Sequence, residues 1–302
     1  MKSRWILIAG GLVACGGAQE PAASSPQHAS EPAASLARVI PVGARWTEHA
    51  HHEHAHHGSE SIGDRVLGSD DSHATVDLVG VYTVLALGAD AQPSRLSLAV
   101  QQLTVDLSEG AGTDGPESIT LSNTVVFERQ SDRTFTFVPE SLDDSVDVGV
   151  LEIALHMVGP LAEQGPWQNP SFDVTEGVVP GSSWAIDVTP TIARIRSDMG
   201  LDVVASAIDG RWTLSDAGEA EWTLEATESA SSVALLDAPP GATVRDASIA
   251  ITRELTIPRD GTRPNTRDAL RATSTVHVDI PTPDGAATGE MTYSMMELRE
   301  RS

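Results

Sequence analysis

The sequence predicts an all-β protein, folded as an antiparallel sandwich or an open barrel. Runs rich in Val, Leu and Thr alternate with short turns rich in Gly, Pro and Asp, which is the pattern of strands joined by hairpins. No long segment places apolar residues at helical spacing, and only Thr266–Ala272 has room for two helical turns. Cys15 is the single cysteine, so the chain has no internal disulfide and packing must stabilise the fold.

The first half of the chain contains two expected hairpins and a further strand. Val76–Leu87 is followed by a polar break and then by Leu96–Leu107, which indicates one hairpin. Thr124–Phe127 and Thr134–Val138 indicate a second. Leu151, Ile153 and Leu155 alternate with other residues, which predicts a strand with one solvent-facing side.

The second half contains a hairpin of Arg211–Leu214 with Glu221–Leu224. Each strand carries a Trp and a Leu two positions apart, so these side chains share a face. Asp70-Asp71 and Asp143-Asp144 lack the spacing of a calcium loop and are expected in turns.

Two pairs of segments suggest an internal duplication. Pro41–Trp46 resembles Val179–Trp184, and Pro139–Leu155 resembles Pro281–Met295. The number of residues that separates the two members is similar in both pairs. They predict duplicated halves, an N-terminal β half at 38–175 and a C-terminal β half at 176–302. A single irregular sandwich with unrelated Gly-x-x-Trp segments is the alternative, and the choice stays open.

The N-terminus has the parts of a secretory signal. Lys2 and Arg4 form a positive head, and Trp5–Val13 is a short apolar run. Leu12-Val13-Ala14-Cys15 resembles the lipobox of bacterial lipoproteins, and the Gly-x-x-Trp segments resemble the opening strand of uncharacterised all-β bacterial lipoproteins. The lipobox likeness implies a signal peptide at 1–14, removed before Cys15, and acyl chains on Cys15. An ordinary secretory signal cut near Ala14 is the alternative.

The expected location follows from this likeness. Residues 15–37 hold the lipidated cysteine and a tether rich in Ala, Ser and Pro, which is expected to be disordered. The implied partner is a membrane of the cell envelope, reached through the lipid anchor. Gly16 and Gly17 lack the aspartate that resembles an inner-membrane retention signal, which favours the outer membrane.

The composition excludes several classes of function. The chain has 43 acidic and 19 basic residues, a net charge of −24, which disfavours nucleic-acid binding. Lys2 is the single lysine and lies in the signal, so neither a Schiff-base lysine nor a phosphate-loop lysine is expected. His156 and His277 have nearby carboxylates, Glu152 and Asp279, but no nucleophile accompanies them. The sequence therefore predicts that the protein is not an enzyme.

The segment Glu48–His57 contains six histidines and two glutamates. Imidazole and carboxylate groups suit Zn²⁺, Cu²⁺ or Ni²⁺. In an extended chain two faces form; the candidate metal ligands are His52, His54 and His56 on one face, and His49, His51 and His57 on the other. A flexible loop that binds metal loosely and a polar hairpin loop that binds none are the two interpretations. No other cofactor is expected.

The sequence thus predicts a non-enzymatic lipoprotein with a binding or structural role at the cell envelope, with an envelope protein as a candidate partner. One alternative is a carrier of a lipid or other hydrophobic ligand between two half-sheets, in an apolar cavity lined by Trp46, Trp184, Trp212 and Trp222. The other is a transition-metal binder or sensor that uses the histidines of segment 49–57.

Overall fold

The computed structural model describes most of the chain from residue 36 onward. The described residues are 36, 38–62, 65–109, 117–119, 124–131, 135–138, 148–159, 178–216, 218–236, 241–282 and 285–302. Residues from Ala33 to Ser302 form one compact unit. The lipobox, the tether up to residue 35 and Asp143-Asp144 lie outside the described residues.

The described residues form mostly strands, which confirms the all-β class. The strands of the first half are β1 (Arg45–Ile62), β2 (Arg65–Leu87), β3 (Pro93–Glu109), β4 (Glu117–Ile119), β5 (Thr124–Arg129) and β6 (Phe135–Phe137). Those of the second half are β7 (Ser183–Ala185), β8 (Leu201–Val203), β9 (Ile208–Asp216), β10 (Glu221–Ala230), β11 (Val233–Leu235), β12 (Thr243–Pro258), β13 (Arg267–Thr282) and β14 (Gly285–Arg301). Two α-helices, α1 (Val148–Val158) and α2 (Thr189–Met199), and the short 3₁₀ helix η2 (Ala205–Ala207) accompany them.

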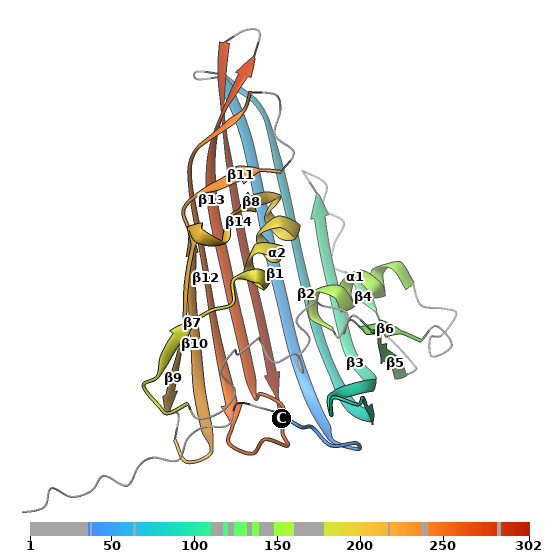
Figure 1. Cartoon of the computed structure of the whole chain (residues 1–302). Helices are drawn as coiled ribbons and strands as arrows, with labels where there is room; N and C mark the ends of the chain where they lie inside the picture. The colour runs from blue at the N-terminus through green and yellow to red at the C-terminus, as the bar shows by residue number, and fades with distance from the viewer. Residues whose placement is uncertain are drawn as a thin grey trace, which may run out of the picture. The chain divides into compact units, whose positions relative to one another are not determined.

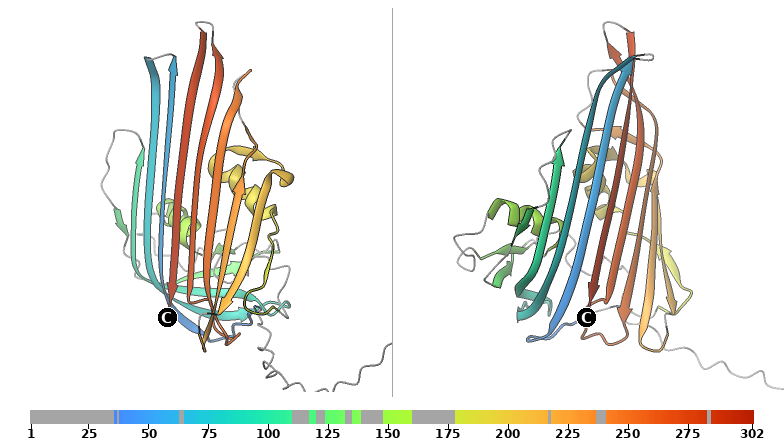
Figure 2. Two further views of the ribbon diagram at one scale, coloured as in Figure 1. Left: turned by 90° about the vertical axis from the view of Figure 1, so that its left-hand side faces the viewer. Right: turned by 180° about the vertical axis from the view of Figure 1, so that it is seen from behind.

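One large antiparallel sheet contains nearly all of these strands (Figure 1). Its order is β6-β5-β3-β2-β1-β14-β13-β12-β10-β9-β7, with β4 paired to β3, and β8 and β11 form a separate two-stranded sheet. The expected hairpins β2–β3, β5–β6 and β9–β10 are all present. β1 and β14, the first and last strands in the sequence, pair with each other in the middle of the sheet, so the blue strand lies beside the red one (Figure 2).

The two halves of the sequence therefore meet edge to edge. Strands before residue 176 occupy one side of the β1–β14 pair, and those after it occupy the other side. The carrier hypothesis placed a cavity between two separate half-sheets. In the structure, backbone hydrogen bonds between β1 and β14 join the two halves into a single sheet. Whether they arose by duplication stays a prediction.

Strict alternation makes one face of this sheet the buried face. Along β1, Trp46, Glu48, Ala50 and His52 are buried while the residues between them are more exposed. The register aligns these positions with buried residues of β2 and β14, because successive side chains in a strand point to opposite sides. The His-rich segment is thus the interior of a central strand, and both loop interpretations of it are wrong. Asp70-Asp71 also lie within a strand, β2, rather than in a turn.

The expected strand at Leu151–Leu155 is instead helix α1. Leu151, Ala154, Leu155 and Val158 are fully buried, whereas Ile153 is 43% exposed. This spacing of three and four residues places the buried side chains on one helical face, which packs into the apolar cluster of the first half. The resemblance of Pro139–Leu155 to Pro281–Met295 does not extend to secondary structure, since the second segment ends in strand β14.

Helix α2 was not foreseen, and the helical turns expected at Thr266–Ala272 are part of strand β13. Pro190 lies in the first turn of α2, and Gly200 ends the helix with φ of 64°, the left-handed conformation that glycine adopts without strain. Ile195 packs with buried residues of β12, β13 and β14. Both helices therefore cover the buried face of the sheet.

Three apolar clusters fill this face. One lies over β1, β2, β3, β5 and α1 and includes Trp46 and Tyr82. A second joins α2, β8 and β11 to β12, β13 and β14. A third contains Trp212 and Trp222, with Trp184 packed against it. In the part of the chain that the structure describes, no helix is long and apolar enough to cross a membrane.

Candidate ligand-binding site

An apolar pocket of about 590 Å³ opens beside the second cluster. Its apolar lining comes from the end of α2, from β11 and from the buried face of β13 and β14, and consists of Met199, Gly200, Leu235, Val278, Ile280, Gly289 and Met291. The β1–β2 hairpin supplies its polar edge, which consists of Gly58, Ser59, Glu60, Gly68, Ser69 and Asp70. We call this site the apolar pocket.

The chain reversal after α2 builds one wall of the apolar pocket. Gly200 turns the chain from α2 into β8, and its carbonyl oxygen accepts a hydrogen bond of 3.1 Å from the Leu236 N–H. This bond fixes the end of β11 next to the helix end, so Met199 and Leu235 face the same space. The wall is therefore held by backbone geometry as well as by side-chain packing.

Two glycines on the opposite wall of the pocket, Gly68 and Gly289, differ in the space around them. A Cβ atom on Gly289 would lie 2.7 Å from Val278 Cγ2, so this position tolerates no side chain without rearrangement. A Cβ atom on Gly68 would meet nothing within 4 Å. Side chains introduced at position 68 would therefore extend into open space, whereas position 289 is already closely packed.

Hydrophobic surface dominates this site. Exposed apolar surface normally costs free energy in water, and sites for small molecules are mostly apolar concavities of roughly 300–1,000 Å³ with a few polar groups. The volume and lining of the apolar pocket fit that description. The arrangement suits noncovalent burial of a hydrocarbon chain.

A buried charged layer lies on the same face, farther along the strands. It consists of Glu48, Arg253, Asp268, Glu297, Arg299 and Arg301, all on β1, β12, β13 or β14. Met291 and Arg299 are eight residues apart on β14, which corresponds to roughly 26 Å of strand. On β12, Arg253 stands between Ile251 and Leu255, which belong to the second and third clusters. The buried charged layer thus separates the core beside the apolar pocket from the tryptophan-containing core.

Close ion pairs hold this layer together. Arg253 donates to Asp268 from Nε at 2.9 Å and from Nη2 at 2.6 Å. Arg301 Nε donates to Glu48 Oε2 at 2.6 Å, and Arg299 Nε donates to Glu297 Oε1 at 2.7 Å. Burial by itself raises the pKa of Asp268, but the charge and hydrogen bonds of Arg253 outweigh burial and hold this pKa below its usual value.

The pKa values of Arg299 and Tyr82 shift in the directions that this environment imposes. Burial lowers the pKa of Arg299, but the carboxylates of Glu297, Glu48 and Asp268 outweigh burial and raise it. The pKa of Tyr82 is raised by burial and by Glu48. Near neutral pH, Asp268 and Arg299 therefore stay charged and Tyr82 stays neutral.

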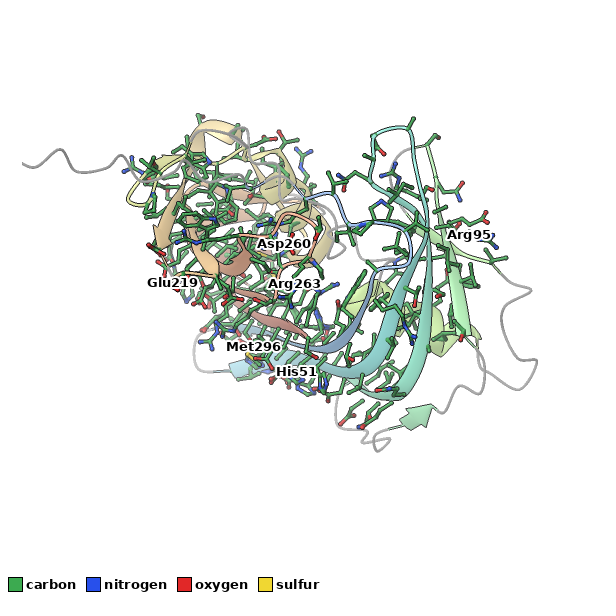
Figure 3. The ribbon with its side chains drawn as sticks, turned by 90° about the horizontal axis from the view of Figure 1, so that it is seen from below. His51, Arg95, Glu219, Asp260, Arg263 and Met296 are labelled. Carbon is green, nitrogen blue, oxygen red and sulfur yellow. The ribbon has the colours of Figure 1, made fainter. Side chains whose placement is uncertain are left out.

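The histidines of segment 49–57 are divided between the two faces of β1. His52 is buried on the inner side, and His54 and His56 lie on the same side but are partly exposed. On the outer side His51 Nδ1 lies 2.7 Å from Asp77 Oδ1, and His57 Nδ1 lies 2.5 Å from Asp71 Oδ1. Figure 3 shows His51 near Met296 of the neighbouring strand.

Glu53 lies on the same side of β1 as His51, 3.9 Å from His51 Nε2 and 3.6 Å from His73 Nε2. Within the described ranges, no group of three or more His, Cys, Asp or Glu side chains is placed to hold a metal ion. The hypothesis of Zn²⁺, Cu²⁺ or Ni²⁺ binding by this segment, including His49, stays untested.

The four tryptophans are packed in the clusters described above. Trp46 stacks on Tyr82 with ring centroids 5.5 Å apart, Trp184 faces Trp212 across β7 and β9, and the Trp222 ring lies 3.8 Å from the Arg259 guanidinium. None of the four is among the described residues that line the apolar pocket. A ligand cavity lined by the tryptophans stays a prediction.

The two isolated histidines occupy surface positions. His156 lies on α1, where Nε2 is 4.0 Å from Glu152. His277 lies on β13, and its Nδ1 is 2.6 Å from Asp246 on the neighbouring strand. The nearby carboxylate foreseen for His277 was Asp279, but the hydrogen-bond partner is Asp246.

The residues that line the apolar pocket were missed in the sequence. Val276, Val278 and Ile280 alternate along β13, which was a signal for a buried strand face. The rest of the lining comes from five other elements, β1, β2, α2, β11 and β14, and no local pattern joins them.

Comparisons with known proteins place the chain in no family. No protein-family model matches it, and no curated protein matches it. Among solved structures it is similar to lipovitellin, from a study of lipid–protein interactions in that protein, with a TM-score of 0.29 and 9% identity. The match covers 85% of this chain but spans only 25% of the lipovitellin chain. A likeness this weak establishes neither fold nor ligand for this chain.

Proposed function

We propose that this chain is a bacterial lipoprotein, anchored to the cell envelope through Cys15, whose β body binds the hydrocarbon chain of a lipid-like molecule. The apolar pocket between the large sheet, α2 and β11 is the observation that supports ligand binding. The lipobox-like residues Leu12–Cys15 support the anchor. In a two-membrane envelope the outer membrane is the proposed location.

The energetics of chain burial favour this role. Each methylene that leaves water contributes about 0.8 kcal/mol. Ten methylenes therefore contribute roughly 8 kcal/mol before the costs of ordering the ligand are subtracted. Ser69 and Asp70 of the β1–β2 hairpin line the pocket and are exposed, so the polar end of an amphiphile beside them can stay in water while its chain is buried.

Binding of a neutral hydrophobic probe tests the ligand-binding part of this proposal. A chain of residues 16–302 contains the whole compact unit from Ala33 to Ser302 and carries no acyl chains. N-phenyl-1-naphthylamine, a neutral dye that fluoresces in apolar surroundings, is expected to bind this protein and to be displaced by dodecanol.

Two substitutions one residue apart locate the binding site. Gly68→Phe places a ring in the open space of the apolar pocket and is expected to weaken dodecanol binding by roughly tenfold or more, the loss of about two buried methylenes. Leu67 is 44% exposed and is not among the described lining residues. Leu67→Phe is therefore expected to bind like the unsubstituted chain. Equal binding by the Gly68→Phe variant would contradict the proposed site.

A further inference from the structure

We infer that the apolar pocket selects amphiphiles whose polar end carries a positive charge, such as long-chain amines and quaternary ammonium compounds. This inference rests on the proposed function and adds the chemical class of the ligand to it. It comes from the charges at the open edge of the pocket.

Two carboxylates, Glu60 and Asp70, line that edge. Glu60 pairs with Gly68, and Asp70 pairs with Gly58, in the β1–β2 register. Residues two apart on a strand, and residues directly opposite on its partner, share a face. Both carboxylates therefore extend from the pocket side of the hairpin. Gly68, which faces Glu60, leaves open space, whereas a Cβ atom on Gly58, which faces Asp70, would lie 3.5 Å from His56 Cε1.

The charges of these carboxylates are not balanced by the neighbouring described residues. Their outward-facing counterparts on the same strands are paired, since Asp71 contacts His57 and Asp77 contacts His51. Among the residues with described coordinates, Glu60 and Asp70 form no ion pair. The described lining of the pocket also contains no Lys, Arg or His side chain.

An amphiphile with its chain in the pocket would hold its polar end beside these two groups. A cationic end is attracted there, a neutral end is not, and an anionic end is repelled by the carboxylates and by the net charge of −24. Exposed ion pairs change affinity by roughly two- to fivefold each. We therefore expect a cationic amphiphile to bind roughly three- to tenfold more tightly than a neutral one of equal chain length.

Three compounds that share a twelve-carbon alkyl chain test this selectivity against the 16–302 chain at pH 8. Dodecyltrimethylammonium, dodecanol and dodecyl sulfate, each below its micelle concentration, displace N-phenyl-1-naphthylamine in parallel titrations. The expected order of affinity is cation, then alcohol, then anion. The preference for the cation is expected to shrink as salt is raised, because salt screens exposed charges.

Matched substitutions assign the preference to the edge of the pocket. The double variant Glu60→Gln, Asp70→Asn is expected to lose the cation preference, so that dodecyltrimethylammonium and dodecanol bind it with about equal affinity. Asp71→Asn removes a carboxylate from the opposite face of β2 and is expected to keep the preference. Persistence of the preference in the double variant would overturn the inference.

The outcomes separate this inference from the proposed function. If all three compounds bind equally, or if dodecyl sulfate binds most tightly, the charge selectivity is wrong while chain binding stands. If dodecanol and the dye fail to bind, the proposed function itself is wrong and the inference falls with it.

Discussion

At the scale of single residues, the buried charged layer is the feature most sensitive to substitution. Removing one member of a buried ion pair leaves the other charge desolvated and unpaired, which costs roughly 3–5 kcal/mol. Asp268→Ala leaves Arg253 in that state and is expected to lower the free energy of unfolding by about that amount. Denaturant unfolding of the 16–302 chain measures the change.

An exposed pair supplies the control for this substitution. Arg196 and Asp202 form an ion pair in which both side chains are about half exposed. Asp202→Ala is expected to cost at most about 1 kcal/mol. If Asp268→Ala costs no more than Asp202→Ala, the buried charged layer does not stabilise the fold as described.

The lowered pKa of Asp268 also gives stability a pH dependence. A carboxyl whose pKa is lower in the folded state contributes stability above its unfolded pKa, near 3.9, and loses it as pH falls through the folded pKa. The stability of the unsubstituted chain is therefore expected to fall below pH 4 more steeply than that of Asp268→Asn. Denaturation midpoints between pH 2.5 and 7 measure this difference, and parallel curves would contradict it.

Glu228 is expected to behave in the opposite sense. Burial raises its pKa, although a hydrogen bond from Thr191 and nearby arginines act against burial. A raised carboxyl pKa favours the folded state in acid and costs stability as pH rises through the folded pKa. Glu228→Gln is expected to raise the denaturation midpoint at pH 7 and to have little effect at pH 4; the reverse pattern would show that Glu228 is stabilised as a carboxylate.

At the scale of elements, α1 shows where periodicity misleads. Leu151, Ile153 and Leu155 satisfy strand alternation, yet Leu151, Ala154, Leu155 and Val158 satisfy helical spacing equally well. Tertiary packing against the sheet decides between the two patterns, and a window of this length contains no signal that separates them.

Two alanine substitutions distinguish the helix from the strand. Leu155 is fully buried and Ile153 is 43% exposed. Leu155→Ala is expected to cost roughly 2–5 kcal/mol of unfolding free energy, whereas Ile153→Ala should cost under about 1 kcal/mol. Comparable losses for both, measured by denaturant unfolding, would favour the strand.

The long strands were the more predictable elements. Alternation of apolar residues identified β2, β3, β9 and β10 because one of their faces is buried and the other is wet. In β1 the inward positions carry Glu48 and three histidines instead of apolar residues, so the polarity of the segment suggested a loop. Buried ion pairs depend on partners more than two hundred residues away, such as Arg301 for Glu48, and no local pattern reveals them.

At the scale of the whole molecule, the apolar pocket could not be predicted from the sequence. It requires the β1–β2 hairpin, the end of α2, β11 and the β13–β14 pair to meet at one place. The tryptophans attracted attention as candidate cavity lining because they are large, but their size also makes them good core residues. The pocket is lined instead by apolar residues smaller than tryptophan and by glycines.

The proposed anchor makes a prediction for the intact chain. Cys15→Ser removes the sulfur that would carry the diacylglyceryl group, and two or more acyl chains are needed for stable membrane association. The variant is expected to move from the membrane to the soluble fraction after cell fractionation. Continued membrane association would contradict anchoring through Cys15.

The central claim is that the β body carries a hydrophobic ligand, and native mass spectrometry of the 16–302 chain purified without detergent tests it most directly. A single added mass of lipid size is predicted, present in the unsubstituted chain and in Leu67→Phe and absent from Gly68→Phe. A bare protein mass, unchanged after incubation with dodecanol or a long-chain amine, would contradict the claim.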